Sequence, residues 1–273
     1  MFNRKELKER AKLVLLRSYS KIFLACLLVN LVSGGGFGVS SRKLKNLDFS
    51  TMPLQKIIAV ITIIVALAVI AVALSILVFE PLDVGLKKFM TENAKYDAQL
   101  DLLLTPFRES YKNIVIVQFV KNLFIFLWSL PAILPTLFAV ALFGDKLAYI
   151  ENIRNGSLLA TAEVAAIMLI WLLFTLVFAV PSIIKELQYT MVPYILADNP
   201  DTEWRSALSK SKEMMVGNKW AYVKLMLSFV PWFLAANLLC CVGGFLVIPY
   251  VEAAVCELYL ELAGRTTVNL EYE

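Results

Sequence analysis

The chain has 273 residues, of which 59% are hydrophobic and 18% are charged, and its formal net charge is +4. Soluble domains average about 45–50% apolar residues, so this composition excludes an ordinary soluble domain and indicates a membrane protein with several spans. The sequence contains no histidine, and histidine is the commonest general base and metal ligand. We therefore exclude a zinc site and a Ser-His hydrolase, and we expect no enzyme activity, no cofactor and no metal ion.

The N-terminal segment is predicted to be a basic amphipathic helix over residues 1–17. Asn3, followed three residues later by Glu6, resembles a capping box, which marks the start of a helix. The apolar stripe of this helix consists of Leu7, Ala11, Val14 and Leu15. A first transmembrane span follows at about 18–37. The charged region before it is too long for an ordinary signal peptide, so we expect no cleavage.

The remaining apolar runs predict five more spans. The run at 57–79 has no charged residue and is long enough to cross the hydrocarbon core of a bilayer. The other spans are expected at about 113–143, 158–184, 220–241 and 245–263. The segment 86–112 alternates charged and apolar residues, which favours an amphipathic element on the membrane surface. The fold class is therefore an all-α polytopic membrane bundle, with six transmembrane helices in three hairpins within a single domain.

A second amphipathic helix is predicted at 201–217, between the fourth and fifth spans. Thr202 or Asp201 is a suitable N-cap. One face of this helix consists of Trp204, Ala207, Leu208, Ser211 and Met215. Lys210 and Lys212 lie on another face, so we expect the helix to lie along the membrane with these cations towards lipid phosphates. The alternative is a helix that packs on a neighbouring loop.

The distribution of cations predicts the orientation of the chain. With the N-terminus inside, twenty of the 26 Lys and Arg residues fall in inside segments and six in outside segments. Inside loops of membrane proteins carry an excess of Lys and Arg. We therefore expect six spans with both termini in the cytoplasm.

The four cysteines are expected to be small core residues. Cys26, Cys240, Cys241 and Cys256 all lie in or beside apolar runs, and none has the spacing of a metal ligand. Their positions therefore suggest packing and not chemistry.

Several stretches resemble a known family. They are PSIIKELQYTMVPYILADNP, SKEMMVGNKW, LSFVPW and IPYVEAAVCELY in the second half, with ELKERAKLVL and LDLLLTPFRESY before them. On these motifs the whole chain resembles the bacterial six-pass membrane family known as domain-of-unknown-function family 975. It is also distantly similar to the membrane domains of some bacterial glycerophosphodiesterases. The resemblance implies a bacterial cell-membrane protein, and it implies no reaction, ligand or partner.

Ionisable residues inside apolar runs are the candidate functional residues, because such groups are costly in a bilayer and usually face a partner or a wet cavity. Glu252 falls near the middle of the sixth span, and Glu257 lies nearer the cytoplasm. Lys121 and Lys224 lie near the cytoplasmic ends of the third and fifth spans. These four residues predict a polar cluster in the inner leaflet. The cluster is either a substrate or proton site, or a set of charge pairs that fixes helix register.

Two functions follow from these patterns. The first is a non-enzymatic membrane scaffold or accessory protein that acts through its cytoplasmic interfacial helices. The second is a transporter of a small molecule or lipid, with an inner-leaflet polar site. We expect membrane lipids as partners, together with a membrane protein or a second copy of the chain, and no nucleic acid. Expected contacts to anionic lipids are Arg4, Lys5, Lys8, Lys12, Lys210 and Lys212.

The orientation predicts which single cysteines react with an impermeant reagent in intact cells, once the native cysteines are removed. Cysteine at position 48 or 152 should be labelled from outside, because both positions lie in outside loops. Cysteine at position 93 or 209 should stay unlabelled until the cells are opened. Labelling of either inside position in intact cells would overturn the topology.

Overall fold

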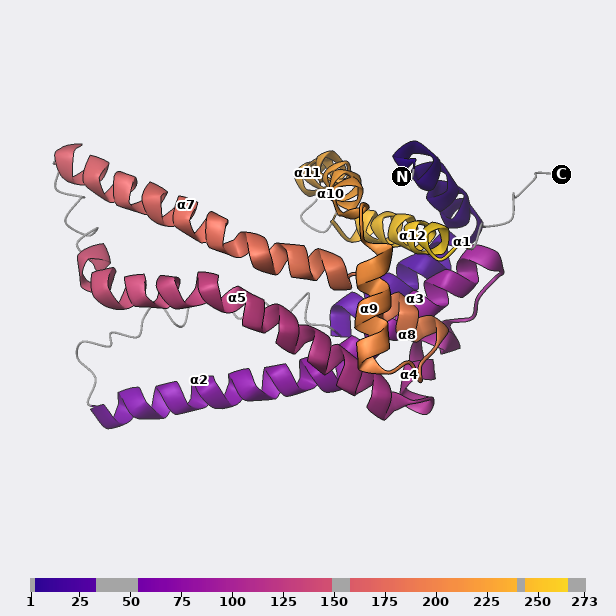
Figure 1. Cartoon of the computed structure of the whole chain (residues 1–273), viewed down its shortest axis with the longest axis horizontal. Coiled ribbons are helices and arrows are strands. Elements are labelled where there is room, and N and C mark those ends of the chain that lie inside the picture. Colours follow the sequence, from indigo (N-terminus) through magenta and orange to yellow (C-terminus); the bar gives the residue numbers. More distant parts are fainter. Residues whose placement is uncertain (1–2, 33–53, 149–157, 240–243, 265–273) are drawn as a thin grey trace. The chain divides into compact units, whose positions relative to one another are not determined.

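The computed structural model describes residues 3–32, 54–148, 158–239 and 244–264. Every element within these residues is a helix, which confirms the all-α class. The bounds are α1 (Arg4–Val32), α2 (Leu54–Leu74), η1 (Ser75–Phe79), α3 (Glu80–Lys95), η2 (Leu100–Leu104), α4 (Thr105–Arg108), α5 (Tyr111–Ala148), α7 (Leu158–Tyr189), α8 (Val192–Asp198), α9 (Trp204–Met214), α10 (Lys219–Leu227), α11 (Val230–Leu239) and α12 (Gly244–Leu262) (Figure 1).

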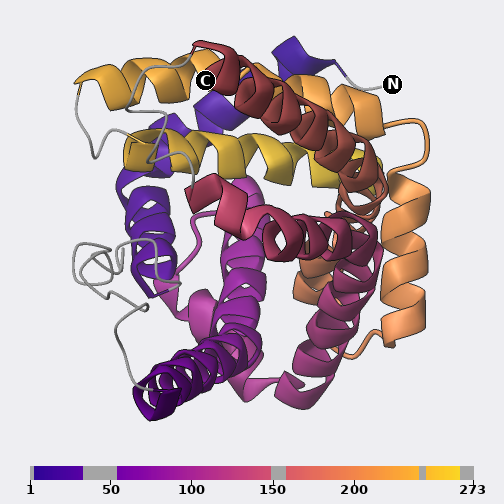
Figure 2. The same cartoon turned by 90° about the vertical axis from the view of Figure 1, so that its left-hand side faces the viewer.

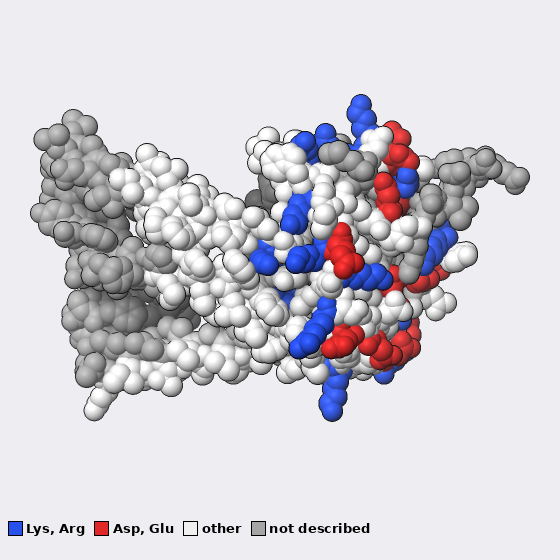
Figure 3. Space-filling view, viewed as in Figure 1, with Lys and Arg blue, Asp and Glu red and all other residues white. Residues whose placement is uncertain are grey.

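The chain divides into two compact units. Unit 1 comprises Met1–Phe119 and Met191–Glu273, and unit 2 comprises Val120–Thr190. Positive and negative side chains lie side by side over the face of unit 1 in Figure 3. Unit 2 contains most of α5 and all of α7, and Lys185 of α7 lies 4.8 Å from the centre of the Trp128 ring of α5. This cation–aromatic contact joins the two long helices of unit 2.

Helices α3 and α8 form the core of unit 1. The run Val192–Ala197 in α8 is buried throughout, and α3 contacts α1, α8, α12 and η2. Figure 2 shows α12, in yellow, beside α1 and α3. We expected a surface element at 86–112, but its first part, in α3, is buried on several sides. Charged residues in the sequence suggested exposure, whereas packing of four other elements around α3 covers it.

Helix α1 follows the predicted pattern closely. The side chain of Asn3 accepts a hydrogen bond from the backbone N–H of Lys5 at 3.1 Å, as a helix N-cap does. The four residues of the predicted stripe are all buried, and α1 packs against α12. Ser18 has non-helical backbone angles, φ −139° and ψ 33°. The helix is therefore interrupted where the predicted basic segment meets the predicted first span; residues 33–37 of that span lie outside the described part.

The apolar helix α2 continues through η1 into α3 despite Pro81. Proline has no N–H, so Pro81 leaves the carbonyl of Leu77, four residues earlier, without its helical partner. The hydroxyl of Tyr111 donates a hydrogen bond to this carbonyl at 2.7 Å. The single π turn of η1 lies directly before the proline, and such turns relieve local mismatch in a helix. The helix thus passes its proline because a side chain from α5 supplies the missing donor.

Helix α9 packs its predicted face on the protein. Ala207, Leu208 and Ser211 are buried, and the hydroxyl of Ser211 accepts a hydrogen bond from the backbone N–H of Met191 at 3.2 Å. The helix begins after Glu203, and Thr202 instead donates its hydroxyl to the carbonyl of Asn199. The expected N-cap is therefore wrong, because this hydroxyl closes the preceding turn.

Within the described residues, five helices are long and apolar enough to cross a membrane. They are Arg4–Val32, Ile58–Lys95, Tyr111–Leu134, Leu169–Asp198 and Lys219–Leu238. The last is interrupted between α10 and α11. The predicted sixth span coincides with α12, which is not among the five and carries Glu252, Glu257 and Glu261. The chain is thus a helical protein of membrane character.

At Gly85 of α3 the packing leaves no room for a side chain. A Cβ atom at this position would lie 2.1 Å from the carbonyl oxygen of Leu103 in η2, which is closer than any real contact. Gly85→Ala should therefore lower the unfolding free energy by about 1–3 kcal/mol, as overpacking does, measured as a lower Tm in detergent.

Gly244→Ala is the matched control. Its nearest neighbour is Asn237 Nδ2 at 3.9 Å, so the added methyl group meets no clash. Equal Tm values for the two variants would show that η2 does not press on α3 at Gly85.

Candidate functional site

A buried ion cluster lies between α3 and α12 in unit 1. Lys87 Nζ is 2.6 Å from a carboxylate oxygen of Glu252 on α12 and 3.2 Å from one of Asp83, a turn earlier on α3. The Lys87 side chain is only 11% exposed. Removing an ammonium group from water costs several kcal/mol unless opposite charges lie close to it. The two carboxylates supply these charges, and the contact with Glu252 links the register of α3 to that of α12.

Aromatic residues cover one side of the cluster. The Tyr194 ring, from α8, lies 5.4 Å from Lys87 Nζ and 5.0 Å from the parallel Tyr259 ring of α12. The Tyr259 hydroxyl donates a hydrogen bond to the carboxylate of Asp198. The Tyr194 hydroxyl is buried and has no hydrogen-bond partner within the described residues. Charge, cation–aromatic attraction and ring stacking therefore act on the same three helices.

The four residues of the predicted polar cluster are distributed over different elements. Glu252 and Glu257 lie on α12, with Glu257 1% exposed. Lys121 belongs to unit 2 and Glu252 to unit 1. Lys224 Nζ lies over the ring of Trp220, 5.7 Å from its centre. The partner found for Glu252 is thus Lys87.

Sequence reasoning missed Lys87 because it counted this residue as one inside cation among several. One local signal was present: Asp83 and Lys87 are four residues apart, the spacing of a stabilising pair on a helix. The contact with Glu252 spans 165 positions, and no local pattern predicts it.

The cysteines near the cluster are buried. Cys256 lies one turn after Glu252 on α12, and Cys26 lies on α1. Both are 2% exposed, as expected for small core residues. Cys240 and Cys241 lie outside the described residues. Among the residues that the structure describes, His, Cys, Asp and Glu form no group of three that could hold a metal ion.

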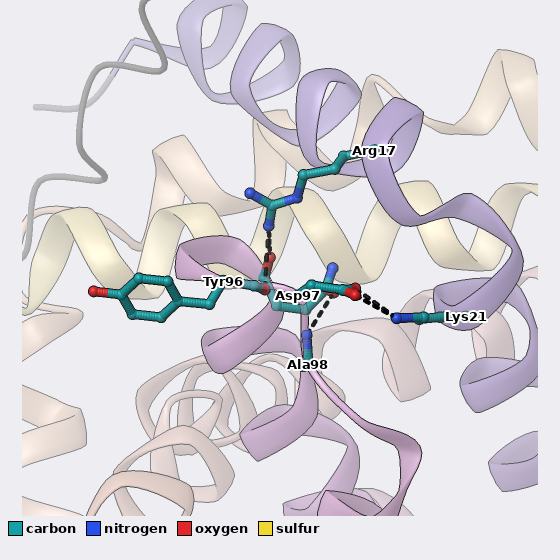
Figure 4. Close-up of polar contacts among 6 residues, drawn as sticks. Arg17, Lys21, Tyr96, Asp97 and Ala98 are labelled. Atoms are coloured by element: carbon teal, nitrogen blue, oxygen red, sulfur yellow. Dashed lines mark hydrogen bonds and ion pairs between the residues drawn. The ribbon is translucent and has the colours of Figure 1, made fainter.

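Two cations of α1 hold the end of α3 (Figure 4). Lys21 Nζ lies 2.6 Å and 2.7 Å from the two carboxylate oxygens of Asp97. Arg17 donates to the backbone carbonyl of Asn93 and, at 3.3 Å, to that of Tyr96. Asn93 lies in the last turn of α3 and Tyr96 is its C-cap, where a helix leaves carbonyl acceptors unsatisfied. The contacts tie the second half of α1 to the connection between α3 and η2.

The predicted lipid-contact cations fall into two groups. Lys5, Lys12, Lys210 and Lys212 are exposed. Arg4, which is also exposed, and the half-buried Lys8 donate to backbone carbonyls at the end of α10, Arg4 to Lys224 at 3.4 Å and Lys8 to Ser228 at 3.2 Å. Lys8 Nζ also lies 4.2 Å from the centre of the Phe229 ring. Lys8 therefore donates a hydrogen bond to a backbone carbonyl at the break between α10 and α11.

The comparisons with known proteins agree with the motifs. A family model described as "Protein of unknown function (DUF975)" matches residues 1–266. No curated protein matches the chain, and no solved structure does. The distant similarity to glycerophosphodiesterase membrane domains stays a prediction.

The ion cluster predicts a clear order of stabilities. Lys87→Met should lower the unfolding free energy by about 1–3 kcal/mol, because it leaves the half-buried Glu252 without its partner. The double variant Lys87→Met/Glu252→Gln should recover much of this loss, because the only carboxylate left without Lys87 is Asp83, whose side chain is 35% exposed. Thermal unfolding in detergent measures all three proteins.

The exposed pair Arg108–Asp101 supplies the control. Its side chains are 63% and 62% exposed, and exposed pairs contribute about 0–1 kcal/mol. Arg108→Met should therefore change Tm little. If Lys87→Met is as stable as Arg108→Met, the cluster does not stabilise unit 1.

Proposed function

Since the chain belongs to the DUF975 family, whose function is unknown, we propose from its own contacts that it is a non-enzymatic membrane scaffold or accessory protein. It acts through helices α1 and α9 at the cytoplasmic membrane surface. The supporting observation is that charge in the core of unit 1 is used internally, by Lys87 with Asp83 and Glu252. The charged groups that other molecules can reach are therefore those on the surface.

Helix α9 is the surface that fits this role best. One face packs on the core through Ala207 and Leu208, so the helix is held rigidly. Its outer face carries Arg205, Lys210 and Lys212 in exposed positions. An ordered helix with exposed cations on both sides of its packed face suits an acidic protein surface or anionic lipid headgroups, and its order lowers the entropy cost of binding.

We place the protein in the bacterial cell membrane with six spans and both termini in the cytoplasm. The five apolar helices support five of these spans. The sixth is α12, whose 19 residues extend about 28 Å, close to the thickness of a hydrocarbon core, about 30 Å. Pairing of Glu252 with Lys87 lowers the cost of a glutamate in this helix. Asn93 is fully buried, so exposed Ser209 is the better inside probe of the orientation.

Transport of a small molecule or lipid is the second candidate, because the same carboxylates suit a substrate or proton site. Asp83 is the most open member of the cluster, with a side chain 35% exposed. The transport and scaffold hypotheses differ in one requirement. A transport site requires water to reach Glu252, whereas a scaffold requires only that the charges stay paired.

The scaffold role predicts a protein contact at α9. A photo-reactive amino acid at Ser209, activated in native membranes, should give a discrete protein adduct. Reversing the charges of Lys210 and Lys212 to Glu should reduce its yield, because the cations of this face are proposed to attract the partner. The same amino acid at Asp101, an exposed position of η2, is the matched control and should give no adduct that depends on these lysines. Adducts with lipid alone, or equal yields before and after charge reversal, would contradict a partner on this face.

A thiol measurement separates the transport alternative. With Cys240 and Cys241 replaced by Ser, the chain retains Cys26 and Cys256, both buried. A small maleimide should label them only after denaturation, whereas Ser209→Cys should react at once. Rapid labelling of Cys256 in the folded protein would reveal a wet path beside Glu252 and favour transport.

A further inference from the structure

Cations from two distant segments meet at the last turn and the C-cap of α10, and no interaction described above neutralises them. Arg4 donates to the carbonyl oxygen of Lys224 at 3.4 Å, and Lys8 to that of Ser228 at 3.2 Å. A carbonyl accepts a hydrogen bond but carries no net charge. The sequence of α10, KWAYVKLML, contains no acidic residue, and Glu6 on α1 is bound to Arg10. This corner of unit 1 is therefore positive.

The side chain of Lys224 extends from this corner back to the beginning of an apolar helix, where its ammonium group lies over the Trp220 ring. A candidate membrane span runs from Lys219 to Leu238, so its first residues fall at the membrane–water boundary. Trp220 is 65% exposed, and Lys224 Nζ lies 5.7 Å from the centre of its ring. Tryptophan favours this boundary because its ring is apolar and its N–H is polar. Lysines near the ends of a span direct their ammonium groups towards the headgroups.

We propose that Arg4, Lys224 and Trp220 bind the headgroup of an anionic phospholipid. A guanidinium presents paired donors that match two oxygens of a phosphodiester. The ammonium of Lys224 adds a second positive charge, and the Trp220 ring packs against the glycerol and the first methylenes of the lipid. The site joins the N-terminal helix to the fifth span, so one lipid contacts both.

The inference deepens the proposed function, since it names one lipid site at the membrane surface where α1 is proposed to act. It uses different residues from the α9 surface. It also does not depend on which side of the membrane the site faces. A test with anionic lipid in both leaflets therefore fails or succeeds independently of the proposed topology and of the α9 partner.

The full chain can be tested through its own tryptophan. Trp220 is retained while the other four tryptophans, Trp128, Trp171, Trp204 and Trp232, are changed to Phe. The protein is reconstituted in phosphatidylcholine vesicles that contain a minor share of phosphatidylglycerol. Bromine on the acyl chains of one lipid or the other quenches nearby indole fluorescence. Brominated phosphatidylglycerol should quench Trp220 more strongly, per mole of lipid, than brominated phosphatidylcholine does.

Charge variants identify the residues responsible. Arg4→Gln and Lys224→Gln should each weaken the preference for phosphatidylglycerol about fivefold, the effect of removing one cation near an anionic membrane surface. Arg4→Lys keeps the charge without the paired donors and should lose less than Arg4→Gln. The control Lys12→Gln/Lys210→Gln removes two exposed cations from other positions and should leave the preference unchanged. Fluorescence-detected thermal unfolding verifies that each variant is folded.

Each other outcome overturns the proposal. Equal quenching by the two brominated lipids would show a general interface with no anionic site. Weak quenching by both would show that a protein surface, such as a second copy of the chain, covers Trp220. A preference lost in Lys12→Gln/Lys210→Gln but kept in Arg4→Gln and Lys224→Gln would assign the lipid to the exposed cations and leave the α9 proposal standing.

Discussion

The ammonium group of Lys87 lies among buried side chains, and the packing of unit 1 must keep two carboxylates beside it. Asp83 comes from the same helix and Glu252 from α12, so the requirement is met only when α3 and α12 are in the correct register. An apolar interface tolerates small shifts along a helix, whereas loss of a buried ion pair costs several kcal/mol. Stacking of Tyr194 on Tyr259 also fixes the position of α12, because it joins α8 to α12 beside the same charge.

This register explains how a charged helix becomes a core element. The apolar helix α2 does not end at Glu80 and Pro81; it continues as α3 into the centre of unit 1. Its continuation depends on the Tyr111 hydroxyl, which serves the carbonyl that the proline leaves unbonded. Gly85 then permits the backbone of η2 to approach. The hydroxyl thus supplies a hydrogen bond that the proline removes, and the missing side chain of Gly85 avoids a clash with the backbone of η2.

Cations in unit 1 are used in two different ways. Lys87 and Lys21 meet carboxylates, so their charges are largely compensated. Arg4, Lys8 and Arg17 meet backbone carbonyls instead, which satisfies their hydrogen bonds and leaves their charges in place. The second arrangement has two consequences. It supplies donors to helix ends and breaks, and it maintains a positive surface that attracts anionic groups.

The sequence by itself determined the helical class, the long apolar segments and the amphipathic faces. The buried stripe that begins at Leu7 and the packed face of α9 follow from residues three or four apart, and such spacing reports directly which side of a helix is apolar. The interruption at Ser18 also falls where charge gives way to apolar residues. Only the tertiary structure decided that α3 is core and that Glu252 meets Lys87, 165 positions away. Periodicity is a property of one helix, whereas a buried charge is partnered by whichever residue the packing of other helices places within about 3 Å, and that placement is encoded in no single segment.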